Sequence, residues 1–572
     1  MRPFSPLLRG CVLLGWVLLL LAVVGAGPAR AGTTAPSPPY APTALTAPSA
    51  AYWSRAGLVR APGGPYLTDA EGRIMQLHGI DLVGKCGGGA AAANAAGSPC
   101  IGPAAGPNLA YVLSPVAVDP ARRFTAANAE TLAQLGFNVV RLGILWEGLE
   151  PGPPGVGPND PRYCTAQPPA APFPALGSAD PYDAAVLNAY LARTDTIVRL
   201  LARVGIRVII DMHQDAWGSA FETATGASPW VGDGAPPWAT CTGTSRFGSP
   251  VTWPGAYLDP AVKQAIHNFF ANDVRGDLQG QYARVWQAVA RHYRANDDVI
   301  GYDLYNEPDD FDVPRFDQEL QCDYGGPLHE PMSCIRSQAQ ALRGGLIGAV
   351  QAADPRHIIF FEPSGATNYG TPERIGIAEP LRFRNVALAF HMYGDAAVQL
   401  AMIAADRRRT VTDQIGGPPT IMDEFGASPD ASATAATVNL AGRTGLSWSY
   451  WSALQLDDPT SGSPQEGLIN QQTGQPYPAM ARALAVPYPA ATAGTPGAET
   501  FYRATARFVY SYAVARSGHS PTQIMLPPYT YPRGYTVRVQ GAAVVSAANA
   551  SMLELRALPR ALTVQVTVRP RG

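Results

Sequence analysis

The feature that most constrains the fold is a regular alternation of short apolar runs with longer helical stretches. Eight runs rich in β-branched residues lie at 74–82, 138–142, 206–211, 299–306, 357–362, 386–391, 420–424 and 446–451. Helical periodicity occurs between them, as at 126–135, 183–204 and 279–293. Continuously apolar strands that alternate with helices are typical of a parallel sheet covered on both faces. Eight such units predict an α/β chain with a (β/α)8 TIM barrel over residues 53–482.

Polar side chains stand at or just beyond the carboxyl ends of most of these runs. They are Arg141, Asp211, His213, Asn306, Glu307, Glu362, His391, Tyr393 and Glu424. In (β/α)8 barrels, the carboxyl ends of the strands form the rim that holds the active site. One charge in such a place can simply mark the exit of a strand into solvent, but this explanation weakens when most strands end this way. The pattern therefore predicts an active site at this rim.

The pattern changes after about residue 483, where short alternating runs are separated by turn residues. These runs lie at 507–513, 522–526, 535–540, 542–547, 552–557 and 562–568. Such alternation predicts a small antiparallel β-sandwich over residues 483–572. It contains no cluster of catalytic residue types, so we expect it to brace the barrel, with an independent sugar-binding module as the alternative.

Residues 1–31 have the organisation of a secretory signal peptide. Two arginines precede an apolar run over 11–27, and a small-x-small cleavage site ends at Ala31. The run is shorter than the roughly 20 residues of a membrane-spanning helix. Residues 32–52, rich in Thr, Ala, Pro and Ser, predict a linker. We therefore expect a secreted, extracellular protein, with association with the cell envelope as the alternative.

Cysteine number agrees with export. Of the 7 cysteines, Cys11 would leave with the signal peptide, and the others are Cys86, Cys100, Cys164, Cys241, Cys322 and Cys334. An even number in an exported chain predicts disulfides. Short separations favour Cys86–Cys100 and Cys322–Cys334, which leaves Cys164–Cys241, although other connectivities stay open.

Two classes of partner are disfavoured by the sequence. The 42 basic and 44 acidic residues give a formal net charge of −2, and no basic patch or polybasic tail stands out, so we expect no nucleic-acid partner. The sequence has neither a CxxC pair nor an HExxH motif. We therefore predict no metal site and no cofactor.

Two of the apolar runs end in a glutamate within a distinctive motif. Residues 301–308 read Gly-Tyr-Asp-Leu-Tyr-Asn-Glu-Pro, and residues 419–426 read Pro-Thr-Ile-Met-Asp-Glu-Phe-Gly. Glu307 and Glu424, on separate strands of one barrel, can face each other across a small gap. Retaining glycoside hydrolysis requires two carboxyls about 5–5.5 Å apart, one ionised as nucleophile and one protonated as general acid. The residues alone do not assign the two roles.

The ordered set of motifs resembles glycoside hydrolase family 5, and within it the endoglycoceramidases. The resembling segments lie at 136–143, 146, 150–151, 211–215, 303–308, 423–427, 450–452 and 457–459, and more loosely at 475–478 and 531–535. The resemblance covers nearly all of the mature chain. It implies a β-glycosidase that cuts between the glycan and the ceramide of glycosphingolipids by double displacement, with Glu307 as acid/base and Glu424 as nucleophile.

The resemblance also implies roles for the neighbouring residues. Asn306 would bind the sugar 2-hydroxyl, Arg141 would lie near Glu424, and Tyr393 of the His391-x-Tyr393 motif would hydrogen-bond that glutamate. The sugar next to the scissile bond would contact Lys85, His213, Asp215, Trp253 and Trp451.

Several of these assignments have alternatives. Trp451 could be a core aromatic, Trp253 a loop packing residue and Lys85 a surface charge. The chain also departs from the family at Asp81, where an asparagine is usual, and at 452–455, which is more apolar than expected. Both departures would change the preference for sugar or aglycone without removing the carboxylate pair.

Two long insertions, at 216–258 and 309–332, follow strands at the predicted catalytic face. The first contains Trp217, Trp230, Trp238, Trp253 and Tyr257. Long ordered loops in this position usually shape the substrate groove. These aromatics could line an apolar channel for a lipid, but ordinary loop cores have the same appearance in sequence.

Two other functions stay open from the sequence. The same mechanism could act on β-glucan, β-mannan or a simple glucosyl or galactosyl lipid. A barrel that binds carbohydrate or lipid without catalysis is the second alternative, which the presence of both glutamates with Asn306 and Arg141 disfavours. A glycolipid substrate would also bring the protein into transient contact with a membrane surface.

Overall fold

The computed structural model describes most of the predicted barrel and sandwich. The described residues are 59–62, 64–83, 124–153, 159–161, 163–164, 182–221, 233–242, 257, 259–271, 278–308, 346–362, 384–393, 419–454, 466–470, 473–515 and 520–572. The predicted signal peptide and linker lie outside these residues, as do Cys86, Cys100, Cys322 and Cys334. Among the described residues, no helix has both the length and the apolar character needed to cross a membrane.

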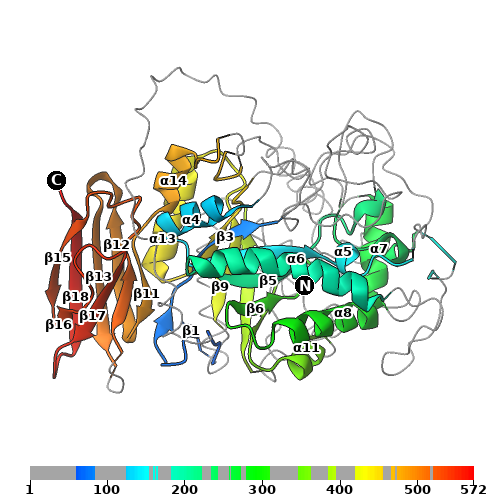
Figure 1. Ribbon diagram of the computed structural model, residues 1–572, viewed down its shortest axis with the longest axis horizontal. Coiled ribbons are helices and arrows are strands. Elements are labelled where there is room, and N and C mark those ends of the chain that lie inside the picture. The colour runs from blue at the N-terminus through cyan, green and yellow to red at the C-terminus, as the bar shows by residue number, and fades with distance from the viewer. Residues whose placement is uncertain are drawn as a thin grey trace, which may run out of the picture. The chain divides into compact units, whose positions relative to one another are not determined.

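Eight parallel strands close into a barrel in the order β10-β3-β4-β5-β6-β7-β8-β9 (Figure 1). They are β3 (His78–Leu82), β4 (Val139–Leu145), β5 (Arg207–His213), β6 (Val299–Asp303), β7 (Ile358–Phe361), β8 (Val386–Met392), β9 (Thr420–Phe425) and β10 (Ser447–Tyr450). Almost every residue of these strands is buried, because side chains fill the barrel interior and helices cover its outside. The predicted (β/α)8 barrel is confirmed.

Helices surround the barrel as the sequence periodicity predicts. They are α4 (Ala126–Gln134), α5 (Trp146–Leu149), α6 (Ala184–Arg203), α7 (Pro260–Ala271), α8 (Leu278–Tyr293), α11 (Gly348–Ala353), α13 (Ala431–Thr444) and α14 (Pro478–Leu484). In Figure 1, α6 and α8 run alongside β5 and β6. Helix α6 begins where the Asp183 side chain accepts a hydrogen bond from the Ala185 N–H, and its buried face includes Leu187, Leu191 and Leu201.

Two antiparallel sheets form the remainder of the fold. One has the order β1-β2-β11-β14-β17-β16 and the other β12-β13-β18-β15. Their strands are β1 (Leu67–Thr68), β2 (Ile74–Met75), β11 (Tyr488–Thr492), β12 (Gly494–Tyr502), β13 (Arg507–Val514), β14 (Thr522–Met525), β15 (Tyr535–Gln540), β16 (Ala542–Val544), β17 (Met552–Ala557) and β18 (Thr563–Pro570). All six runs predicted after residue 483 are strands, and β11 and β12 are additional to them.

One predicted strand is wrong in extent. The apolar run over 74–82 is divided between β2, which pairs with β11 in the six-stranded sheet, and β3, which enters the barrel. The division follows from the partners available, because Ile74 and Met75 lie opposite Thr492 and Ala491, whereas His78 lies opposite Trp448. A continuous apolar run does not reveal such a change of sheet.

Specific contacts join the sandwich to the barrel helices. Arg503 donates hydrogen bonds to the carbonyls of Arg482 and Ala483 at the end of α14 and to the Asn439 side chain in α13. Tyr488 donates from its hydroxyl to the carbonyl of Gly136, 2.9 Å away, just after α4. These contacts agree with a bracing role for the sandwich.

A disulfide joins Cys164 to Cys241, with the two Cα atoms 5.3 Å apart. This is one of the three predicted pairs, and the cysteines of the other two lie outside the described residues. It ties residues 163–164 to the segment at 233–242, which packs beside the exit of β5 through the mutual backbone hydrogen bonds of Asp215 and Asp233.

The packing inside the barrel gives a first prediction. A Cβ added at Gly301 in β6 would lie 2.5 Å from the Ile358 carbonyl oxygen and 2.5 Å from the Phe360 ring. Because the backbone of β7 cannot yield locally, Gly301→Ala should lower the free energy of unfolding by about 1–3 kcal/mol, measured by urea denaturation. Gly572→Ala, where a Cβ would meet no atom within 4 Å, is the control. An unchanged midpoint for Gly301→Ala would contradict this description of the packing.

Candidate active site

Closure of the barrel gathers the predicted rim residues at one end of the strands. Arg141 comes from β4, His213 from the end of β5, His391 from β8 and Glu424 from β9. Asn306 and Glu307 follow β6, Glu362 follows β7, Tyr393 follows β8, and Trp451 follows β10. Lys85 and Trp253 lie outside the described residues. Within the described part of the chain, these nine polar and aromatic residues thus lie in or just after the barrel strands.

Glu307 and Glu424 lie side by side with His391 between them. The His391 Nδ1 atom is 2.7 Å from Glu307 Oε1 and 2.6 Å from Glu424 Oε2. One oxygen of each carboxyl and one ring nitrogen all lie within 4.8 Å of one another. This close approach fits a retaining pair, whose carboxyls are about 5–5.5 Å apart, and not an inverting pair, whose carboxyls are about 6.5–9.5 Å apart.

The two glutamates differ in the direction of their pKa shifts. Burial raises the pKa of Glu307; His391 opposes this rise, and the negative charges of Glu424 and Asp215 add to it. Burial also penalises the ionised form of Glu424, but His391, Arg141 and His213 outweigh that penalty and hold its pKa below the ordinary value. One carboxyl thus favours its protonated form and its neighbour its ionised form.

The acidic neighbours of His391 favour its protonated form. Burial opposes its protonation, but Glu362, Glu424 and Glu307 raise its pKa well above the ordinary value. Its second nitrogen, Nε2, is 3.3 Å from Glu362 Oε1 and 3.8 Å from Asp423 Oδ1. Acidic groups therefore face both nitrogens of the ring, with the hydrogen bond made by Nδ1 to Glu307.

Arg141 supplies the second buried cation. Its Nε donates to Asp303 Oδ2 at 2.9 Å, and its NH2 group donates to Asn306 Oδ1 at 2.8 Å and to Glu362 Oε1 at 3.0 Å. Asp211 is 3.1 Å and Glu424 3.9 Å from the guanidinium. Arg141 is therefore close to Glu424, as the family resemblance implied, although its direct hydrogen bonds go to Asp303, Asn306 and Glu362.

Too many carboxyls surround these two cations for all of them to be ionised. Burial raises the pKa of Asp303 well above its ordinary value, and the Glu362 charge adds to the rise. Burial likewise raises the pKa of Asp423 to about 6, although Arg141 opposes the shift. Burial also raises the pKa of Asp81, which stands where the family usually has asparagine. A protonated Asp81 could again donate a hydrogen bond, as an asparagine would.

Glu362 is a site residue that the sequence analysis placed at the rim but did not select. Its Oε1 accepts from Arg141 and lies near His391, while its Oε2 accepts the backbone N–H of Glu307 at 2.9 Å. Glu307 has φ +46°, a conformation that costs a non-glycine residue about 1 kcal/mol or more. Glu362 thus helps to hold the backbone of Glu307, and its position at the end of a barrel strand was the available signal.

The Asn306–Glu307 turn is held from a second side by Gln214. The Gln214 side chain donates to the carbonyl of Asn306 at 2.9 Å, and Asn306 Nδ2 donates to the carbonyl of Gln214 at 3.0 Å.

Tyr393 is hydrogen bonded to the Glu424 side chain, and burial raises its pKa well above the ordinary value, so its hydroxyl keeps its proton and can donate. The hydrogen bond between Tyr393 and Glu424 agrees with the one that the resemblance implied.

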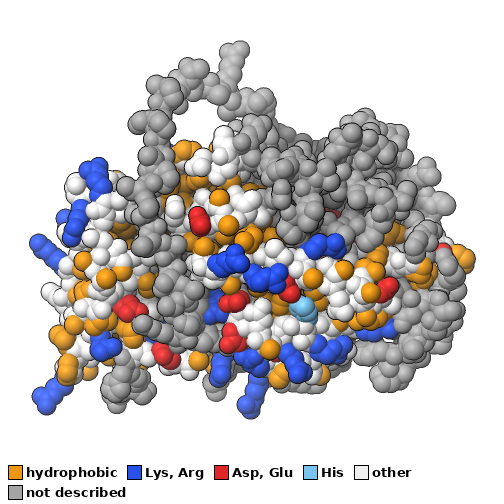
Figure 2. Space-filling model, viewed as in Figure 1, with side chains coloured by type: hydrophobic (Ala, Val, Ile, Leu, Met, Phe, Trp, Pro, Cys, Tyr) orange, Lys and Arg blue, Asp and Glu red, His pale blue; other side chains and the backbone are white. Residues whose placement is uncertain are grey.

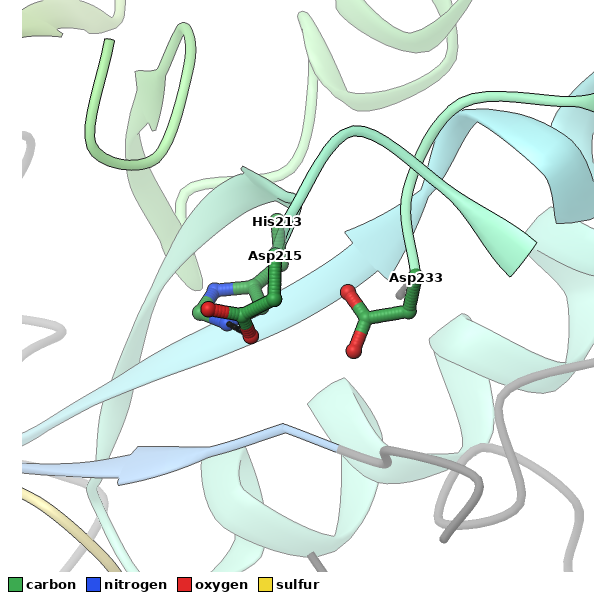
Figure 3. A group of neighbouring side chains, drawn as sticks. All are labelled: His213, Asp215 and Asp233. Atoms are coloured by element: carbon green, nitrogen blue, oxygen red, sulfur yellow. Dashed lines mark ion pairs between the residues drawn. The ribbon is translucent and has the colours of Figure 1, made fainter. Parts of the chain in front are cut away.

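A second polar cluster lies beside this centre and comprises His213, Asp215 and Asp233 (Figure 3). His213 Nδ1 is 2.8 Å from Asp211 Oδ2, and His213 Nε2 is 3.3 Å from Asp215 Oδ2. The His213 ring also stacks on Trp451, with ring centroids 5.5 Å apart. In Figure 3 the Asp233 carboxylate points toward the other two side chains from a neighbouring segment.

Donor atoms in three groups lie close enough together to hold a metal ion. Within each group they are within 4.8 Å of one another, in the sets His213/Asp215/Asp233, Glu307/His391/Glu424 and Glu362/His391/Asp423. Two of the groups share His391, and their carboxyls favour its protonated form. Asp215 and His213 of the first group are the residues that the resemblance assigns to sugar hydroxyls.

The aromatic residues of the first insertion give a correction. Trp217, Trp238 and Tyr257 do not line a channel; all three are buried in the hydrophobic core. Trp238 packs edge-on against Trp146 and donates from its indole to the Glu150 carbonyl. Trp230 and Trp253 lie outside the described residues. Where the sequence left two explanations open, loop packing is correct for these three residues.

A closed parallel barrel with paired glutamates at its rim is an arrangement found in retaining O-glycosyl hydrolases. Residues 120–456 match the Cellulase domain of glycosyl hydrolase family 5, and residues 487–569 match the C-terminal domain of that family. The chain belongs to glycoside hydrolase family 5.

Several proteins that are similar to this chain are endoglycoceramidases. Endoglycoceramidase I of Rhodococcus hoagii is 26% identical over 86% of this chain and 84% of its own. Endoglycoceramidase of Cyanea nozakii is 26% identical over 42% of each chain. Among solved structures, the lactosyl-enzyme intermediate of endo-glycoceramidase II from Rhodococcus sp. has a TM-score of 0.63 at 25% identity, covering 89% of this chain and all of that one. An endogalactoceramidase at 22% identity shares the fold, with a TM-score of 0.60.

The contacts of Glu362 give a prediction for the site. Glu362→Gln keeps the shape and the acceptor for the Glu307 N–H but removes the negative charge beside His391 and Arg141. We expect kcat to fall by about 10- to 100-fold, since a small misplacement of reacting groups has effects of this size. The pKa of His391, followed by NMR of its ring, should fall toward the ordinary histidine value.

The exposed Glu71, changed to Gln, is the matched control and should alter neither quantity. A wild-type kcat together with an unchanged pKa of His391 in Glu362→Gln would contradict this role of Glu362 in the site.

Proposed function

We propose that the protein hydrolyses the bond between the glycan and the ceramide of glycosphingolipids, with retention of configuration at the anomeric carbon. The observation that carries the catalytic part is the pair Glu307 and Glu424, within 4.8 Å of each other around His391 and with opposite pKa shifts. The ceramide part is supported by the names of the similar proteins, one of which is solved as a ganglioside GM3 complex.

In the first step, Glu424 attacks the anomeric carbon and Glu307 gives its proton to the departing ceramide oxygen. The C–O bond to ceramide breaks as the bond from C1 to the Glu424 oxygen forms, so ceramide leaves as an alcohol. In the second step, Glu307, now ionised, takes a proton from water as the water oxygen attacks C1. Glu424 leaves as a carboxylate, and Glu307 is again protonated.

The other residues bind the sugar or hold the two glutamates. Asn306 is proposed to bind the 2-hydroxyl, and Lys85, His213, Asp215 and Trp253 the other hydroxyls of the sugar. His213 stacks on Trp451, so these two proposed sugar contacts lie side by side. Tyr393, His391 and Arg141 hold Glu424 ionised and in place.

Export belongs to the same proposal. We infer from residues 1–31 that the chain is secreted by a cleaved signal peptide, so that it acts outside the cytoplasm on glycolipid in a membrane or micelle. Soluble β-glucan is a second candidate substrate, because residues 120–456 match the domain named Cellulase.

A substrate panel separates the two candidates. Purified enzyme should release intact oligosaccharide from a ganglioside and should be at least about 100-fold less efficient on soluble β-glucan, since a built aglycone site contributes to transition-state binding. Chromatography of the released glycan measures both. Turnover of β-glucan without turnover of any glycolipid would transfer the proposal to the soluble substrate.

Single substitutions separate the roles of the two glutamates. Glu424→Gln should lower kcat for every substrate by several orders of magnitude, about 10⁴-fold or more, because no covalent intermediate can form. Glu307→Gln should lower kcat on glycolipid by about 10²–10⁴-fold but spare formation of the intermediate from an aryl glycoside whose leaving group needs no proton. Equal losses on both substrates in both variants would contradict the assignment of roles.

The opposed pKa shifts predict the pH dependence. Glu307 must hold its proton, so kcat/KM should fall as pH rises through its raised pKa. Glu424 must be ionised, so the acid limb should lie below the ordinary glutamate range. In Glu424→Gln one negative neighbour of Glu307 is removed, so the pKa of Glu307, measured by carbon NMR of labelled glutamate, should fall. An unchanged pKa would show that the two carboxyls are not coupled.

A further inference from the structure

The near-neutral charge of the whole chain conceals a basic carboxyl-terminal domain. Residues 483–572 contain nine arginines, at 503, 507, 516, 533, 538, 556, 560, 569 and 571, and two acids, Glu499 and Glu554. Burial raises the pKa of Glu499 well above its ordinary value, so this acid does not offset the arginines. The carboxyl-terminal domain is therefore basic, although the chain as a whole is nearly neutral.

Most of these arginines face solvent. Arg533, Arg538, Arg556, Arg560, Arg569 and Arg571 are all exposed. They lie on or next to β15, β17 and β18, at the side of the sandwich that ends in the edge strands β15 and β16. In Figure 2, basic side chains recur along the margin of this domain, with hydrophobic side chains between them.

Exposed aliphatic side chains occur in the same place. Among the described residues, the large hydrophobic side chains that are exposed are Tyr502, Val544, Val545, Leu558 and Leu562, and all five lie in this domain. Leu562 is 82% exposed and Leu558 49% exposed. A folded protein tolerates isolated exposed apolar residues. Here two exposed leucines lie on either side of Arg560 in one turn, and the exposed Arg556 lies just before it.

Backbone pairing brings these residues to one corner. The turn between β17 and β18 is closed by the Ala561 N–H donating to the Leu558 carbonyl, and Arg560 within it has φ +66°. The Leu558 N–H donates to the carbonyl of Gly541, the residue between β15 and β16. Beside this turn, Arg556 pairs with Ala543. We call Arg556, Leu558, Arg560 and Leu562 the basic corner.

We propose that the basic corner docks the protein on an anionic lipid surface. Leu558 and Leu562 insert at the boundary of headgroups and acyl chains, and Arg556 and Arg560 pair with lipid phosphate or carboxylate groups. Aliphatic side chains flanked by arginines are the combination that binds such interfaces, because apolar insertion and attraction to anionic headgroups act together. The basic domain charge favours this occupant over a neutral surface.

An acidic protein partner would use the arginines but would not require two leucines that protrude from a turn. The proposal is independent of which glycoside the barrel cuts, because the basic corner lies in the sandwich and the glutamates lie at the barrel rim. Docking would keep the enzyme at the surface in which a lipid-linked substrate is embedded.

Vesicle sedimentation tests the proposal with the full chain. Wild-type protein should bind phosphatidylcholine vesicles that contain phosphatidylglycerol, should bind pure phosphatidylcholine vesicles weakly, and should be released by salt. Arg556→Gln with Arg560→Gln should lower the partition coefficient by about 25-fold, since each basic residue near an anionic surface contributes roughly fivefold. Leu558→Ser with Leu562→Ser should lower it by about tenfold.

Two controls make the result decisive. Arg203→Gln, an exposed arginine of α6 on the barrel, should bind as the wild type does. Turnover of a soluble aryl glycoside should be unchanged in both double variants, which shows that they are folded. Equal binding of both double variants and the wild type, or no preference for anionic vesicles, would overturn the proposal. Retention on immobilised polyglutamate without binding to anionic vesicles would instead assign the corner to an acidic protein and would overturn it as well.

Discussion

The structure of the site depends on two cations buried among carboxyls. Arg141 and His391 are both buried, and between them they contact carboxyls from four strands, β5, β6, β7 and β9, or from the residues that follow them. An uncompensated buried charge costs several kcal/mol, so neither cation is stable there without its acidic partners, nor the acids without the cations. The positions of β4 to β9 around the barrel are therefore linked to one electrostatic arrangement. That arrangement also sets the two glutamates to different protonation states.

Much of this could be anticipated from the sequence because barrel strands carry strong local signals. A buried parallel strand is apolar along its whole length, and a polar residue at its carboxyl end stands out. The motifs around Glu307 and Glu424 were therefore visible, and the barrel brings the two residues together as expected. Arg141 and His391 were expected at the site, but which carboxyls each of them contacts depends on the closed barrel and has no local signal.

The features that escaped prediction depend on contacts between distant residues. Glu362 was one rim acid among several, and only the fold shows that it accepts the Glu307 N–H. In the sequence, Trp217 and Trp238 look the same whether they line a channel or pack inside a loop. The structure shows that both are buried in the core. The run at 74–82 reads as one strand because nothing local marks the place where its hydrogen-bonding partner changes from β11 to β10.

The short pair β1–β2 precedes the barrel along the chain, yet it extends a sheet whose other strands, from β11 to β17, come after the barrel. A gene rearrangement that moved residues 483–572 onto another catalytic domain would separate β11 from the neighbour that covers its edge. The exposed edge would then be available for pairing with other chains. We therefore expect the barrel and the sandwich to stay together in evolution, because an exchange of either one alone would break the pairing of β2 with β11.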